Sequence, residues 1–126
     1  LPVGQATQAP VQAALLAQIE TAHCGLLPAA QLPAMLAVHQ QRDRRMAERL
    51  LAAPTPAVLL AGAFHVRRDL GVPLHLQDLA PQVSGERVLM LAEVGQRVSA
   101  ASADFVWYTP AMPAQDHCAS MRPSTR

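Results

Sequence analysis

The spacing of apolar residues in the first part of the chain predicts a short amphipathic helix. Residues 11–22 are rich in helix formers and place apolar side chains on one face, namely Val11, Leu15, Ile19 and Ala22. Gly25 follows closely and is a plausible stop signal for this helix. Residues 1–10 are polar and contain two prolines and a glycine, so we expect a linker or an extended lead-in there.

A longer helix is predicted over residues 30–53. Pro33 fits its first turn, where a missing N–H costs little, and Pro54 and Pro56 end it. Its inner face is expected to carry Leu32, Met35, Leu36, His39, Asp43, Met46, Ala47 and Leu50. Its outer face is expected to carry Gln41, Arg45, Glu48 and Arg49.

The pattern then changes to short apolar runs. Residues 57–62 form a continuous apolar run that ends in glycine, which predicts a buried parallel strand. Further strands are predicted over residues 87–93 and 104–108. The stretch from 63 to 79 is expected to hold a loop, a turn and at most a short helix.

This order of helices and strands predicts an α/β fold with a partial parallel sheet flanked by helices. Two or three strands do not make a stable parallel sheet that is covered on both faces. We therefore expect a piece of a larger α/β domain, or a chain that needs a partner. Residues 1–126 are treated as one unit, with a helical part over 11–53, a strand-rich part over 57–108 and an irregular tail over 109–126.

Composition narrows the class of protein. The chain has 126 residues, a net charge of +1 and 51% apolar residues, so it has material for a core but lacks the basic excess of a nucleic-acid binder. Aromatic residues make up 3%, which disfavours a base-stacking surface. No apolar run reaches the length of a membrane-spanning helix, and no signal-peptide pattern is visible at the start.

The most suggestive group of polar residues follows the first predicted strand. His65, Arg67 and Arg68 come directly after Gly62, and ligands of open α/β sheets bind at the carboxyl ends of strands. His65 could ligate a metal or act as an acid or base, and the arginines could hold an anion. The alternative is structural: His65 caps the loop, and Arg68 pairs with Asp69.

A second group lies on the long helix. His39, Asp43 and Met46 share one face because they are four and seven residues apart. Histidine and methionine are both haem ligands, and the phenol of Tyr108 is a further candidate ligand for iron. The alternatives are that Met46 belongs to the core, that Asp43 pairs with Arg42 or another arginine, and that Tyr108 packs.

The cysteines and the remaining histidines carry weaker signals. Cys24 and Cys118 form no CxxC pair, which excludes a zinc ribbon and leaves either a long-range disulfide or two buried thiols. His23 beside Cys24 is either part of a metal or nucleophile pair, or a helix C-cap. His75 and His117 are isolated, and we expect both to be exposed.

Several segments together resemble one family. HCGLLP (23–28), QQRDRRMAERL (40–50), VLLAGAFHVRRDLGVP (58–73), VLMLAEVG (88–95) and DFVWYTPAMPAQDHC (104–118) look like the C-terminal half of the ChaN-like haem-binding proteins. These are mostly iron-regulated envelope lipoproteins of Gram-negative bacteria, related in fold to erythromycin esterases and Tiki-type proteins. Family members are about twice as long, and their N-terminal half carries a Gly-Glu-x-His type motif that is not present here.

The resemblance implies haem as the cofactor and a role in haem uptake at the periplasmic face of the envelope. It implies that His65 is the motif histidine, that the long helix belongs to a helical insertion beside the sheet, and that Cys24 and Cys118 are bonded. Under this reading the iron ligand is His65, Tyr108 or a residue of the family's N-terminal half, and Arg67 or Arg68 pairs with a propionate. The helix face with Met35, Met46 and Leu50 covers the haem, and His39 is a further residue of the site.

The expected partners are a second copy of the chain and a haem receptor or transporter, with membrane attachment only through a lipid anchor of the full-length form. The competing reading is a metal-dependent or histidine-based hydrolase in which His65 is the base or the metal ligand.

Overall fold

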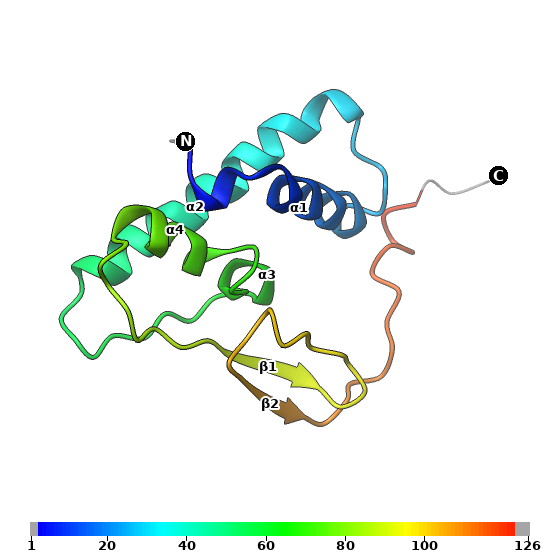
Figure 1. Ribbon diagram of the computed structural model, residues 1–126. Coiled ribbons are helices and arrows are strands. Elements are labelled where there is room, and N and C mark those ends of the chain that lie inside the picture. The colour runs from blue at the N-terminus through cyan, green and yellow to red at the C-terminus, as the bar shows by residue number, and fades with distance from the viewer. Residues whose placement is uncertain (1–2, 123–126) are drawn as a thin grey trace.

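The computed structural model describes residues 3–122 and has helices packed on one side of a two-stranded parallel sheet (Figure 1). This arrangement is the predicted α/β class. In chain order the regular elements are η1 (Gln5–Thr7), α1 (Ala9–Ala22), η2 (Ala29–Gln31), α2 (Leu32–Ala52), α3 (Ala63–Val66), α4 (Val72–Leu79), β1 (Leu89–Glu93) and β2 (Phe105–Thr109). No helix in this part of the chain is long and apolar enough to cross a membrane.

Helix α2 is the centre of the helical part. Its first half packs on α1, where Leu15, Ile19, Leu36 and Leu70 form one buried cluster. Its second half packs on α4, where Ala47, Val72 and Leu76 form another. The predicted apolar stripe of α2 is therefore confirmed, because two different neighbours cover it. On α1 the predicted face is confirmed except for Ala22, which is exposed at the end of the helix.

The lead-in is folded, which corrects the expectation of a linker. Both carboxylate oxygens of Asp78 on α4 accept backbone N–H groups, from Gln5 at 2.7 Å and from Ala6 at 3.0 Å. The side-chain amide of Gln40 on α2 donates to the carbonyl of Ala6 at 2.6 Å. Side-chain partners from two distant helices replace the missing backbone ladder, and such contacts leave no periodic signal in the sequence.

Strands β1 and β2 pair in parallel, with Leu89 opposite Phe105 and Glu93 opposite Thr109. Met90 and Ala92 of β1 are buried, whereas Leu89 and Leu91 point to the other face and are more than half exposed. The alternation shows that one face of β1 is covered, whereas Leu89 and Leu91 on its other face are left open among the described residues. Strand β2 has no such alternation, because Phe105 to Tyr108 are all exposed.

The predicted strand over residues 57–62 is wrong. The segment is extended but pairs with no strand of the described chain, and Val58 and Leu60 are 85% and 90% exposed. A groove of about 510 Å³ lies between residues 57–61 and residues 85–91. The apolar run has the composition of a buried strand, but the groove separates it from the nearest strand, so no ladder forms.

Candidate functional site

Two histidines and an aspartate from two helices meet beneath α3. His39 and Asp43 lie one turn apart on α2, and His65 lies on α3. His65 Nδ1 and Asp43 Oδ1 are 2.5 Å apart, and His39 Nε2 and Asp43 Oδ2 are 3.4 Å apart. The two imidazole rings stack, with centroids 4.4 Å apart and planes 14° from parallel. We call these three residues the His–Asp–His cluster.

The carboxylate at the centre of the cluster is shielded from solvent. The Asp43 side chain is 0% exposed, against 12% for His39 and 25% for His65. Asp43 Oδ2 and His39 Nε2 face each other, yet neither makes a hydrogen bond with any residue between 3 and 122. Buried polar atoms without partners are uncommon and often mark a functional position.

The local backbone brings His65 to this position. Helix α3 is a single turn that begins after Gly62, whose carbonyl accepts the N–H of His65 at 2.9 Å. Gly71 approaches so closely that a Cβ there would clash with the backbone carbonyl of His65. The segment from 62 to 71 therefore folds back tightly, and the His65 side chain reaches Asp43 and His39 on α2.

An apolar groove of about 640 Å³ runs along α2 beside the cluster. His65 lies at its edge, and its remaining lining comes from α2: Ala37, Val38, Gln41, Arg42, Arg45 and Met46. A volume of this size is in the range of small-molecule sites. None of Gln41, Arg42 and Arg45 was predicted as a site residue. Gln41 and Arg45 were expected on the outer face of the helix, and Arg42 was considered only as an ion-pair partner of Asp43.

The arginines after His65 are engaged in ion pairs. Arg67 binds Asp69 through two hydrogen bonds of 2.9 and 2.7 Å, and this partner raises the pKa of Arg67. Arg68 contacts Asp104 and lies 3.6 Å from Glu86. The alternative pairing of Arg68 with Asp69 is therefore wrong, because Asp69 pairs with Arg67 instead.

Asp104 ties the start of the sheet to the segment after α3. It accepts the backbone N–H of Val88 at 2.7 Å and contacts the Arg68 guanidinium. These two interactions lower the pKa of Asp104, the backbone hydrogen bond contributing most. Arg68 thus links the turn after α3 to both strands.

The structure brings three of the six predicted site residues together at the groove. His65 and Met46 line the groove; His39 does not line it but stacks on the His65 ring. Arg67 and Arg68 follow α3 but use their guanidinium groups in ion pairs. Tyr108 lies on β2, a different part of the fold, and is half exposed. Asp43 pairs with His39 and His65, so the alternative in which it pairs with an arginine is wrong.

His75 is buried, which corrects the expectation that it is exposed. It lies on α4 with 2% of its surface accessible, because α4 packs on α2. Burial lowers the pKa of His75 below its usual value, and the charges of Arg44 and His39 act in the same direction. The charges of Asp43 and Asp78 oppose the shift without cancelling it.

A lowered pKa of His75 in the folded state makes stability depend on pH. When the pH falls through about 6.5, the unfolded chain gains a proton at this position and the folded chain does not, so the free energy of unfolding decreases. We expect the urea midpoint to fall on acidification, with a smaller dependence on pH in His75→Gln. An equal pH dependence in both proteins would contradict this assignment.

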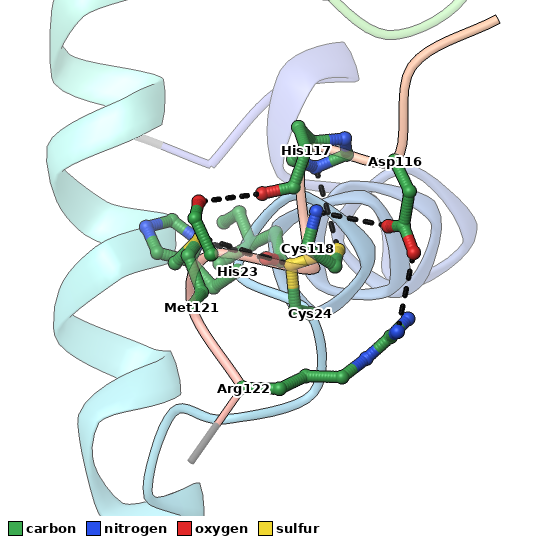
Figure 2. The surroundings of a disulfide bond; sticks show 9 residues. His23, Cys24, Asp116, His117, Cys118, Met121 and Arg122 are labelled. Atoms are coloured by element: carbon green, nitrogen blue, oxygen red, sulfur yellow. Dashed lines mark hydrogen bonds and ion pairs between the residues drawn. A yellow bond between two sulfur atoms is a disulfide. The ribbon is translucent and has the colours of Figure 1, made fainter. Parts of the chain in front are cut away.

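Cys24 and Cys118 form a disulfide, with Cα atoms 5.6 Å apart. Figure 2 shows how the tail is arranged around it: Asp116 accepts the N–H of Cys118 and pairs with Arg122, each at 3.1 Å. The expected bond is confirmed. Because the cysteines are oxidised, they offer neither a thiolate nucleophile nor a metal ligand with neighbouring His117.

The two histidines next to the disulfide, His23 and His117, can now be placed. His117 is exposed, as expected. His23 follows α1, and its Nδ1 is 2.9 Å from the carbonyl oxygen of Ile19. The C-capping interpretation of His23 is therefore confirmed.

Comparison with known proteins agrees with this architecture. A family described as "Haem-binding uptake, Tiki superfamily, ChaN" matches residues 1–76. The solved structure described as "Cofacial heme binding to ChaN of Campylobacter jejuni" is similar at 29% identity and a TM-score of 0.69. The similarity covers 84% of this chain and 42% of that one, so the chain spans less than half of that structure's length. No curated protein sequence matches the chain.

Proposed function

The chain belongs to the ChaN family of haem-binding uptake proteins, and we propose that it binds haem in haem uptake at the cell envelope. The observation that carries the proposal is the apolar groove along α2 with His65 at its edge. A haem presents two broad apolar faces and two carboxylates, so it needs an apolar wall, an axial ligand and cations at the rim.

The residues of the groove fit these requirements. Ala37, Val38 and Met46 offer an apolar wall for the macrocycle. Arg42 lies in the groove lining without an ion pair to any residue of the described range, which makes it the guanidinium best placed for a propionate. Arg67 and Arg68 stay predicted propionate partners, but each would have to leave a carboxylate.

His65 is the leading candidate for the axial position. Asp43 occupies its Nδ1 side, which orients the ring and leaves Nε2 as the nitrogen for an iron ligand or a hydrogen bond. Tyr108 stays the second predicted ligand, and His39 supports His65 by stacking. Bound haem would supply an iron centre that accepts an imidazole or phenolate ligand.

The cellular setting completes the proposal. A structural disulfide supports an oxidising compartment such as the periplasm, where a lipid anchor would hold the protein at the membrane. The uncovered sheet face supports assembly with a second copy of the chain. A receptor or transporter that passes haem on is the remaining predicted partner.

Titration with haemin tests the proposal. We expect a saturable shift of the Soret band at stoichiometric haem, with the affinity lowered more than about tenfold in His65→Ala, because an axial ligand is lost. His117→Ala is the matched control, since this histidine is exposed and lies beside the disulfide in the tail. Light scattering during gel filtration would show whether haem changes the oligomeric state.

Other results of the same titration assign the site differently. A shift that survives in His65→Ala and disappears in Tyr108→Phe would make Tyr108 the iron ligand. The absence of any saturable shift would overturn haem binding by this chain. If the parent chain then hydrolysed a model ester and His65→Ala did not, the hydrolase reading would replace it, with Asp43 orienting the histidine base.

A further inference from the structure

We infer that the His–Asp–His cluster binds a divalent first-row transition-metal ion of the zinc type, separately from haem. Two imidazoles and a carboxylate offer donor atoms that lie within 4.8 Å of one another. This donor set suits Zn²⁺ and related ions, which bind histidine nitrogen and carboxylate oxygen with open positions left for water.

The spacing on α2 fits two ligands of one ion. Ligands about 2.0–2.1 Å from a tetrahedral metal lie about 3.3 Å from each other. His39 Nε2 and Asp43 Oδ2 are 3.4 Å apart, four residues along one helix face. They are two of the three buried side-chain atoms that lack a hydrogen-bond partner among residues 3–122, the third being His75 Nε2 on α4, so a metal would satisfy both atoms of the cluster at once.

His65 completes the set from α3. Its Nδ1 now lies at hydrogen-bond distance from Asp43 Oδ1, at 2.5 Å. Because the two rings stack nearly parallel, the His65 imidazole, which is a quarter exposed, would have to turn out of the stack with His39 to exchange this hydrogen bond for a bond to the metal. A metal held at Nδ1 leaves Nε2 of His65 directed away from the ion, so the two proposals use different atoms of the ring.

The charge around Asp43 also favours a cation. A buried carboxylate is normally matched by a positive group, because burial of an unpaired charge is unfavourable. No neighbouring arginine pairs with it: Arg44 and Arg45 both pair with Glu48, at 3.3 and 3.5 Å, and Arg42 makes no ion pair with any residue between 3 and 122. Among the described residues the ion pairs of Asp43 are with His39 and His65 alone.

Titration of the oxidised, EDTA-treated chain with Co²⁺ and Zn²⁺ in the absence of haem tests this inference. We expect one ion per chain by calorimetry, and visible absorption bands of four-coordinate Co²⁺. His39→Ala and Asp43→Asn each remove a ligand, so each should weaken binding by more than the roughly 10- to 100-fold lost with an outer-shell partner. His117→Ala should bind like the parent chain, and the intact disulfide keeps the cysteines from binding the ion.

The results separate the possibilities clearly. Absence of binding at one ion per chain, or binding by His39→Ala as tight as that of the parent, would overturn the inference. Circular dichroism identifies any variant that fails to fold; if Asp43→Asn does, His39→Gln takes its place, because His39 lies at the edge of the cluster. Since no haem is present, failure here leaves the haem proposal untouched.

Discussion

Removal of the disulfide by Cys24→Ser together with Cys118→Ser is expected to lower the free energy of unfolding by about 4 kcal/mol. The two cysteines are 94 residues apart, so the bond closes a very long loop and strongly restricts the unfolded chain. The described tail beyond β2 has no helix or strand and is mostly exposed. Without the bond, few interactions return that tail to the end of α1.

Urea unfolding followed by far-ultraviolet circular dichroism measures this effect. We expect the oxidised parent to have the highest urea midpoint, and the reduced parent and the double variant to have lower midpoints that agree with each other. Ser120→Ala is a suitable control, because it alters the same exposed turn without touching either sulfur. Equal midpoints for oxidised and reduced parent would show that the bond contributes nothing to stability.

Replacement of the central carboxylate, Asp43→Ala, is expected to lower the free energy of unfolding by about 3 kcal/mol. The substitution removes the hydrogen bond to His65 and the contact with His39, and it leaves a small cavity beneath α3. The higher helix propensity of alanine offsets only a few tenths of a kcal/mol. Breaking a buried polar cluster at its centre exceeds the effect of any exposed substitution on α2.

The measurement is made in EDTA, so that bound metal does not add to the stability of the parent chain. Gln41→Ala is the matched control, because Gln41 lies on the same helix and is exposed. The free energy of unfolding lost in Asp43→Asn should lie between the losses in Gln41→Ala and Asp43→Ala, since the amide keeps the volume of the side chain and part of its hydrogen bonding. A change below about 0.5 kcal/mol in Asp43→Ala, as for a surface position, would show that the cluster does not stabilise the fold.

The helices were predictable because their signals are local. Prolines mark the start and end of α2, and its apolar period places His39, Asp43 and Met46 on one face without any tertiary information. The contact of His65 with that face was not predictable. This contact depends on how residues 62–71 fold, including the close approach of Gly71 to the His65 carbonyl. Local sequence patterns do not show which segments come close together in space. The one local signal was that Asp43 falls on the predicted inner face of the helix, where a carboxylate needs a partner.

The errors have a common physical cause. Residues 57–62 have the composition of a buried strand, but a strand also needs a neighbour, and composition does not say whether one is present. His75 has polar chemistry and was expected at the surface, yet α4 carries it against α2. In both cases the sequence describes a residue's preference, whereas the outcome depends on which element packs beside it.

The uncovered sheet face and the unpaired segment at 57–62 have a consequence for handling the protein. Residues 57–61 contain no charge and no proline, and Leu91 and Trp107 expose more than half of their surface. Open backbone edges with apolar side chains are templates for pairing with other chains, and charged gatekeeper residues are the usual protection. The isolated chain should therefore be prone to aggregate at high concentration. A protein segment that covers the exposed sheet face and residues 57–62 would also keep the chain in solution.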